Sequence, residues 1–301
     1  MTQPARVQIV EVSPRDGLQA EARTLPTETK LELLDRLADA GHTAIEATSF
    51  VSPTSVPQLA DADDLLKRLR RRPGVRYPVL VPNERGFERA LAAGADEIAV
   101  FVSASESYSK KNLGRGRDDA LATACVVVKR AIARGLRVRG YVSMVVADPD
   151  DGPTDPSAVV ETGRALLEAG CAELSLGDTI GAGTPAQVRA LLDAHRGAGI
   201  GLDRLAVHFH DTYGQGLANV LTAIEQGVTV VDASVGGIGG SPFAKSRGAS
   251  GNLATEDVVW MLDGMGIDTG VDVQKLAATA KWMATQLGRE LPGRAARALF
   301  G

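Results

Sequence analysis

The sequence predicts an α/β protein that folds as one (β/α)8 TIM barrel with an additional C-terminal helix. The first observation is that eight short runs rich in β-branched residues alternate with longer amphipathic stretches along the 301 residues. Eight strand–helix units within about 250 residues are typical of such a barrel. The second observation is that the helix-like stretches repeatedly end at glycine, as at Gly41 and Gly170, where glycine closes a helix without strain.

The predicted strands are short and follow one another along the whole chain. They cover residues 7–13, 43–49, 76–82, 97–103, 137–144, 172–178, 205–211 and 231–237. A doubly wound open sheet is the alternative fold. It is disfavoured because no G-x-G-x-x-G sequence, the fingerprint of a dinucleotide-binding fold, follows the first strand.

Polar residues and proline mark where helices begin between these strands. Thr27 is expected to cap a helix over 27–41, and Asn83 to cap the helix that follows it. Pro185 stands in the first turn of a later helix, and another helix is expected to begin at Thr255.

These elements form a single catalytic domain over residues 1–301, with the barrel over about 5–265. The tail, over about 271–290, is predicted as one more helix. This helix either covers the barrel or contributes to a homodimer interface.

Composition disfavours several classes of partner and location. The net charge is −4, which argues against nucleic acid or an anionic membrane surface as the main partner. No signal peptide is recognisable, and no apolar run approaches the roughly 18 residues that a membrane span needs. Two cysteines do not make a disulfide framework, so a cytoplasmic location is expected.

Polar residues gather where the predicted strands end. In a barrel, the carboxyl ends of the strands line the mouth of the active site. The residues concerned are Arg15, Asp16, Glu46, Tyr141, Ser143, Ser175, Asp178, His208, His210, Asp211 and Asn252.

The sequence "HFH" predicts a metal site. Residues two apart in a strand point to the same face, so His208 and His210 can hold one ion from one side. Asp16 is the nearest candidate carboxylate, because its strand ends at the same mouth. Imidazole, carboxylate and amide donors together suit a divalent cation. The alternative is a pair of ordinary hydrogen-bonded histidines.

Arg15 directly precedes Asp16 at a strand end, where its guanidinium can stabilise an oxyanion such as an enolate. The alternative is a structural ion pair with Glu46 or Asp178. These two acids lie in otherwise apolar strands, where acids are rarely buried without a partner. They are therefore expected to hold Arg15 or a histidine in place.

Several long and unusual motifs follow one another along the chain. They are "PRDGLQ" (14–19), "IEATSFVSP" (45–53), "SKKN" (109–112), "VRGYVS" (138–143), "SLGDTIGAGTP" (175–185), "VHFHDTYGQGLANV" (207–220) and "GASGNLATEDVVWMLDGMGIDTGVD" (248–272). In this order the motifs resemble those of the 3-hydroxy-3-methylglutaryl-CoA lyase family, within the DRE-TIM metallolyases. "HFHDTYG" and "DGLQAE" favour the lyases over the related condensing synthases.

The resemblance implies a retro-Claisen cleavage of an acyl-CoA to acetyl-CoA and a keto acid, as in leucine degradation. It implies Mg²⁺ or Mn²⁺ as cofactor, with Arg15 stabilising the enolate that cleavage leaves. The base stays open between His208 and a water bound to the cation. The implied metal ligands are Asp16, His208, His210 and Asn252; Glu46 and Asp178 are the supporting acids, and Tyr141 and Ser175 line the substrate pocket.

Lys110 and Lys111 are candidate contacts for the CoA phosphates, since ammonium groups bind phosphate as point charges. They are equally well explained as solvated loop lysines.

The chain departs from the family pattern around the same mouth. The family's "GGCPxA" loop, whose cysteine helps catalysis, reads "GGSPFA" here, so that Ser241 stands in place of the thiol. A hydroxyl is far less acidic than a thiol, so it is a poor proton reservoir. Two residues are also inserted before "GASGN", a family lysine is Ala22, and "DPDDG" (148–152) replaces "CPYEG".

Three hypotheses therefore stay open. The chain is a hydroxymethylglutaryl-CoA lyase, a lyase or aldolase for a related substrate such as citramalyl-CoA or a CoA-free hydroxy acid, or a non-catalytic paralogue that keeps the metal site.

Overall fold

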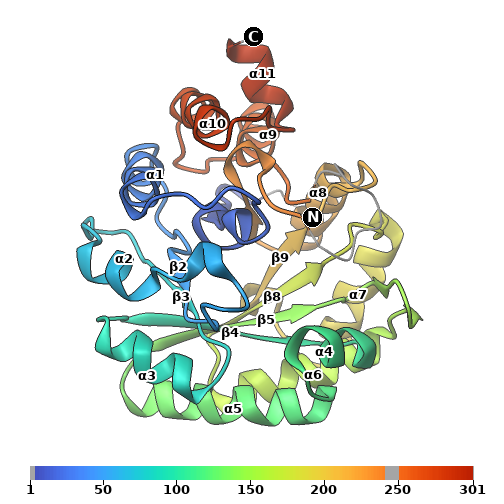
Figure 1. Cartoon of the computed structure of the whole chain (residues 1–301). Coiled ribbons are helices and arrows are strands. Elements are labelled where there is room, and N and C mark those ends of the chain that lie inside the picture. Colours follow the sequence, from blue (N-terminus) through green and yellow to red (C-terminus); the bar gives the residue numbers. More distant parts are fainter. Residues whose placement is uncertain (1–3, 241–250, 301) are drawn as a thin grey trace.

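Eight parallel strands curl into one closed sheet surrounded by helices (Figure 1). The computed structural model describes residues 4–240 and 251–300. The strands follow one another around the sheet in the order β1-β10-β9-β8-β5-β4-β3-β2. Their bounds are β1 Gln8–Glu11, β2 Thr48–Ser49, β3 Val79–Leu80, β4 Glu97–Ser103, β5 Arg137–Ser143, β8 Glu173–Asp178, β9 Leu205–Phe209 and β10 Val230–Ala233.

A parallel bridge between Glu11 and Ile45 joins β1 to the segment before β2 and closes the ring. The predicted (β/α)8 barrel is confirmed. The predicted strand over 43–49 is the least regular: it forms a ladder only at Thr48 and Ser49 and otherwise pairs through single bridges, such as the one from Ala44 to Arg76.

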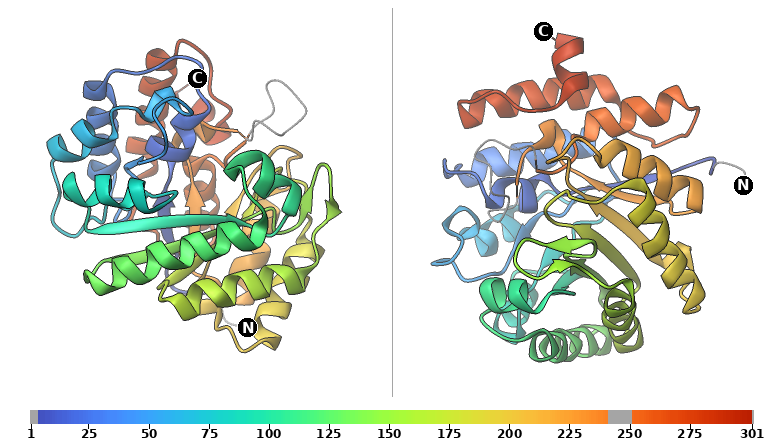
Figure 2. Two further views of the ribbon diagram at one scale, coloured as in Figure 1. Left: turned by 60° about the horizontal axis from the view of Figure 1, so that its bottom comes forward. Right: turned by 90° about the vertical axis from the view of Figure 1, so that its right-hand side faces the viewer.

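Helices pack outside the sheet on all sides, as the two views of Figure 2 show. Their buried Leu and Val side chains pack on the outer face of the strands. The helices of the barrel are α1 Thr27–Asp39, α2 Ala62–Arg68, α3 Glu84–Ala92, α4 Glu106–Leu113, α5 Arg117–Ala133, α6 Pro156–Ala169, α7 Pro185–Gly197, α8 Gly216–Gln226 and α9 Thr255–Gly264.

The predicted caps are only partly correct. Asn83 caps α3, because its side chain accepts a hydrogen bond from the backbone N–H of Gly86 at 3.0 Å. Thr27 was expected to cap α1, but Pro26 occupies that position and Thr27 is the first helical residue. The Thr27 hydroxyl instead donates to Asp61 at 2.8 Å and so joins α1 to the segment before α2.

The C-terminal extension holds two helices, α10 Val273–Leu287 and α11 Arg294–Phe300, where one was predicted. Both lie at one end of the molecule, beyond α1 and α9 (Figure 1). Asp257 in α9 accepts hydrogen bonds from the backbone N–H groups of Arg294 and Ala295, at 3.1 and 2.6 Å. The first turn of α11 is thereby fixed to the barrel.

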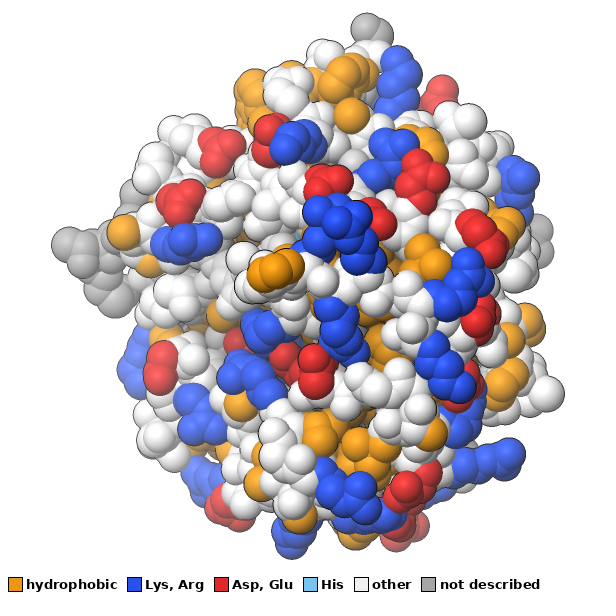
Figure 3. Space-filling view, turned by 90° about the vertical axis from the view of Figure 1, so that its left-hand side faces the viewer, with side chains coloured by type: hydrophobic (Ala, Val, Ile, Leu, Met, Phe, Trp, Pro, Cys, Tyr) orange, Lys and Arg blue, Asp and Glu red, His pale blue; other side chains and the backbone are white. Residues whose placement is uncertain are grey.

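Basic and acidic side chains are mixed over the outer face formed by α1, α2 and α3 (Figure 3). Arg36 pairs with Glu32 at 2.6 Å, and Arg68 pairs with Asp64 at 2.8 Å. Charge on this face is therefore arranged in pairs of opposite sign. Among the described residues, none of the helices is long and apolar enough to cross a membrane.

Two buried acids hold the two described ends of the glycine-rich segment between β10 and α9. Glu11 accepts from the backbone N–H of Val235 at 3.0 Å and from the Thr255 hydroxyl at 2.6 Å. Glu256 accepts from the backbone N–H of Gly236 at 2.9 Å. The described ends of this segment are therefore held in place by one carboxylate from β1 and one from α9.

Stability is expected to fall as pH rises through neutrality because of Glu256. Burial raises the pKa of this carboxyl from 4.5 to about 8. The folded state thus binds more protons than the unfolded state between these values, and stability decreases across that window. Glu256→Gln keeps an oxygen for Gly236 and removes the charge. We expect the variant to lose up to about 5 kcal/mol of this pH dependence, measured by urea unfolding at acidic and alkaline pH. Parallel pH curves for variant and wild type would contradict it.

Candidate active site

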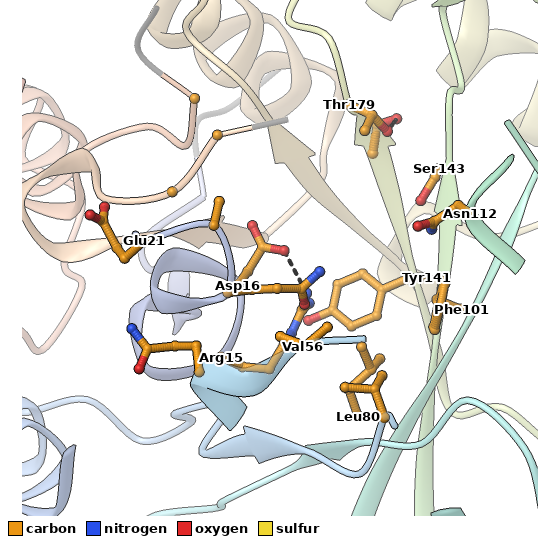
Figure 4. Close-up of a pocket in the computed structure, with 18 of the residues that line it drawn as sticks. Arg15, Asp16, Glu21, Val56, Leu80, Phe101, Asn112, Tyr141, Ser143 and Thr179 are labelled. Atoms are coloured by element: carbon orange, nitrogen blue, oxygen red, sulfur yellow. Dashed lines mark hydrogen bonds and ion pairs between the residues drawn. The ribbon is translucent and has the colours of Figure 1, made fainter. Parts of the chain in front are cut away.

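A cavity of about 1530 Å³ opens at the carboxyl ends of the strands. Asp16 and Glu21 lie on one wall, and Asn112, Ser143 and Thr179 lie on the opposite wall (Figure 4). The predicted site residues that line this cavity are Arg15, Asp16, Tyr141, Ser143, His208 and His210. The structure therefore brings residues from strands far apart in sequence to one place.

The tight turn over Ser13–Gly17, directly after β1, places Arg15 and Asp16. Arg15 is almost completely buried, and its Nε donates to Glu46 Oε2 at 2.7 Å while Nη1 pairs with Asp16. Among the described residues, Arg15 Nη2 makes no hydrogen bond. The predicted contact between Glu46 and Arg15 is therefore present, and the guanidinium keeps donors for a ligand.

Asp16, His208 and His210 form a cluster of potential metal ligands. One candidate ligand atom from each residue lies within 4.8 Å of the others. The two Nε2 atoms of His208 and His210 face each other at 3.3 Å, and His208 Nε2 lies 3.8 Å from Asp16 Oδ2. This is the arrangement that two histidines two apart in a strand were predicted to give.

The electrostatics of this cluster favour a cation. Burial alone would raise the pKa of Asp16, but Arg15 and His208 outweigh it, so that the pKa lies well below its usual range. Burial, reinforced by His208, lowers the pKa of His210 to about 4. Asp16 is therefore an anion and His210 a neutral imidazole at neutral pH, and these are the forms that bind metals.

Asn252, the fourth implied ligand, lies next to Asp16. Its side-chain Nδ2 donates to Asp16 Oδ2 at 2.8 Å and to the carbonyl of Ile238 at 3.2 Å. An amide binds a cation through its oxygen, so the Asn252 amide would have to turn to take part.

Tyr141 lies between two arginines on the cavity floor. Its ring centroid is 5.3 Å from the guanidinium carbon of Arg15 and 5.0 Å from that of Arg139. Its hydroxyl donates to Glu46 at 3.2 Å. Tyr141 thus both lines the cavity, as expected, and supports the acid that holds Arg15.

Asp178 and Ser175 have partners other than those expected. Asp178 accepts from the backbone N–H groups of Ala182 and Gly183, at 3.2 and 2.8 Å, and so shapes the loop after β8 instead of bonding Arg15 or a histidine. Burial raises its pKa to about 6. Ser175 is fully buried beneath the cavity, where it donates to Asp232 at 2.8 Å.

The two lysines proposed for CoA phosphates lie on the exposed side of α4. Lys110 pairs with Glu106 at 3.0 Å and Lys111 with Asp150 at 2.5 Å. Neither lines the cavity, although Asn112 beside them does. Ser241 lies outside the described residues.

Asp232 and Arg139 were not among the site residues predicted from the sequence. Both are buried, and they form an ion pair with an Nη2–Oδ1 distance of 2.6 Å directly behind His208. The signal was available for Asp232, because it is a charged residue inside an otherwise apolar strand, as Glu46 is. Arg139 lies in a more polar strand, two residues before Tyr141.

The chain is similar to known proteins over nearly its whole length. A family model described as HMGL-like matches residues 6–283. The mitochondrial hydroxymethylglutaryl-CoA lyase of Bos taurus is 50% identical over 297 residues, covering 99% of this chain and 90% of the relative.

Solved structures agree with this match. The HMG-CoA lyase of Bacillus subtilis superimposes with a TM-score of 0.97 at 44% identity and full coverage of both chains. An HMG-CoA lyase of Acinetobacter baumannii, in complex with coenzyme A and 3-methylmalate, gives a TM-score of 0.93 at 35% identity over 99% of this chain and 97% of that one. The chain therefore belongs to the HMGL-like family of hydroxymethylglutaryl-CoA lyases.

Proposed function

We propose that this protein is a carbon–carbon lyase that cleaves 3-hydroxy-3-methylglutaryl-CoA to acetoacetate and acetyl-CoA with the help of Mg²⁺ or Mn²⁺. The observation that carries the proposal is the juxtaposition of Arg15 with the Asp16, His208 and His210 cluster in one cavity. Family membership and relatives about half identical over nearly the whole chain support the same activity.

The donor set fits a divalent cation. Two imidazole nitrogens face each other at 3.3 Å beside an ionised carboxylate, an arrangement that one bound cation would satisfy. Asp16, His208 and His210 would hold it, with the Asn252 amide as a further donor. When bound, the cation supplies Lewis-acid stabilisation of the charge on the substrate's hydroxyl and carboxylate oxygens.

Arg15 supplies the second charge that the reaction needs. Breaking the C–C bond leaves negative charge on the thioester oxygen of an acetyl-CoA enolate. A buried guanidinium held by Glu46 can donate to this oxygen without reorganising during the reaction. Because Glu46 is itself bonded by Tyr141, the direction of the guanidinium is fixed before substrate arrives.

The cavity is large enough for a CoA ester. Its volume of about 1530 Å³ exceeds that of sites for small metabolites. Asn112 and Arg115 lie on its wall, so a long substrate entering the mouth would pass polar side chains before it reached Arg15. The related Acinetobacter baumannii lyase was solved with coenzyme A.

A panel of CoA esters tests the proposal. HMG-CoA, citramalyl-CoA and the free hydroxy acids are incubated with the protein and Mg²⁺, and release of acetyl-CoA and of the keto acid is measured. We expect the highest kcat/KM with HMG-CoA. A clear preference for citramalyl-CoA or for a free hydroxy acid would overturn the substrate assignment, and no cleavage of any compound in the panel would overturn the lyase assignment.

Replacing Ser241 with cysteine is expected to raise turnover of HMG-CoA. A thiol has a pKa near 8.5 and exchanges protons at neutral pH far more readily than a hydroxyl. Steady-state kcat for Ser241→Cys is compared with wild type and with Ser241→Ala. A rate that is unchanged or lower in the cysteine variant would mean that the loop is adapted to another acid.

A further inference from the structure

Asp232 in β10 is the centre of a buried hydrogen-bond network beneath the cavity. Its Oδ2 accepts from His208 Nδ1 at 3.2 Å, from the Ser175 hydroxyl at 2.8 Å and from Arg139 Nη1 at 3.1 Å. Its Oδ1 accepts from Arg139 Nη2 at 2.6 Å. The Asp232 side chain is completely shielded from solvent.

This environment determines which nitrogen of His208 carries hydrogen. A carboxylate bound through both oxygens by one guanidinium is ionised, and an ionised carboxylate only accepts hydrogen bonds. Nδ1 of His208 must therefore be the donor. In the neutral ring Nε2 then has the free lone pair, and this is the atom that faces His210 and Asp16.

We propose that Asp232 is a positioning residue that fixes the tautomer and ring direction of His208, so that Nε2 is presented to a divalent cation. A metal-bound histidine usually donates its other N–H to a carboxylate or carbonyl, which also increases its basicity. The inference rests on the metal site of the proposed function and adds the residue that prepares it.

Arg139 extends the same network to the other half of the site. Its Nη1 also donates to the Tyr141 hydroxyl at 3.0 Å, and Tyr141 in turn donates to Glu46, the partner of Arg15. Arg139 further pairs with Glu173 at 2.8 Å, so it keeps a counter-ion when Asp232 is changed. The metal ligand and Arg15 are thus aligned by one buried set of contacts.

Histidine NMR tests the tautomer in the wild-type protein, and variants serve only to assign its signals. The chain has only four histidines, and ¹⁵N-labelled histidine side chains can be assigned by His→Asn variants. In mildly alkaline, metal-free buffer we expect the signals of His208 to report hydrogen on Nδ1. Hydrogen predominantly on Nε2 would overturn the proposal.

Mn²⁺ affinity provides the second test, with a matched control. In Asp232→Asn, the amide oxygen is expected at the Oδ1 position, because Arg139 only donates and its contact with Oδ1, at 2.6 Å, is shorter than its contact with Oδ2, at 3.1 Å. The amide NH₂ then faces His208 and favours the wrong tautomer. We expect Mn²⁺ affinity, measured by EPR titration, to fall roughly 10–100-fold. Ser175→Ala removes another hydrogen bond to the same oxygen and should change affinity less than about threefold.

The outcomes separate this proposal from the proposed function. If Asp232→Asn binds Mn²⁺ as tightly as wild type, the role of Asp232 is wrong and the metal site stands. If Ser175→Ala loses as much affinity as Asp232→Asn, the effect is general loosening of the network, and the positioning role is also wrong. If wild type binds no Mn²⁺, the metal site of the proposed function fails.

Discussion

Arg15→Gln is expected to lower kcat on HMG-CoA by roughly 10²–10³-fold, the usual effect of removing one preorganised donor from a developing oxyanion. Glutamine preserves some hydrogen bonding but not the positive charge. The loss also leaves Glu46 and Asp16 without the cation that both contact. Turnover is measured with HMG-CoA and saturating Mn²⁺, and metal content is checked in parallel.

Arg15→Lys is the matched control for this prediction. Lysine restores the charge but cannot donate simultaneously to Glu46, to Asp16 and to substrate in a fixed fork. An intermediate kcat is therefore expected, above that of the glutamine variant and below wild type. If both variants kept wild-type kcat and differed only in KM, Arg15 would bind substrate without stabilising the enolate.

The cluster of potential metal ligands could be predicted from the sequence because each of its residues is located by a local rule. His208 and His210 share one strand face, and Asp16 follows another strand at the same end of the barrel. Eight predicted strands that alternate with helices were enough to predict a barrel, in which the carboxyl ends of the strands meet. This alternation therefore predicted that Asp16 lies at the same end of the barrel as the two histidines.

The supporting contacts could not be predicted in the same way, because they depend on barrel register and side-chain direction. Asp178 and Glu46 look alike in sequence, yet Asp178 bonds loop amides while Glu46 bonds Arg15. Ser175 lies deeper in the barrel than the residues that line the cavity, and its hydroxyl bonds Asp232. A shift of one position along a strand exchanges a cavity-lining residue for one that points elsewhere.

The family resemblance had a comparable limit. It indicated contacts for Tyr141 and Asn252 because their motifs match, and the structure places both beside the cluster. Arg139 lies within one of the matching motifs, yet sequence analysis gave it no role. The partner of Arg139 is 93 residues away, on a strand whose acid carries no motif of its own.

His208→Ala is expected to abolish tight Mn²⁺ binding, with affinity falling by more than roughly 100-fold, the upper limit for losing only a supporting contact. The change removes one of three clustered ligand atoms, and Asp232 loses its contact at 3.2 Å. His195→Ala is the matched control, because His195 is also buried but lies on α7 and bonds the carbonyl of Leu191.

Thermal unfolding with and without Mn²⁺ measures the effect. A ligand present at 100 times its Kd stabilises the native state by about 2.7 kcal/mol, so wild type and His195→Ala should both gain stability. His208→Ala should gain almost none at the same Mn²⁺ concentration. Equal stabilisation of all three proteins would show that Mn²⁺ binds elsewhere. His208→Ala leaves Asp16 and His210 in place. A small residual gain in stability would therefore measure the Mn²⁺ affinity of these two ligands alone.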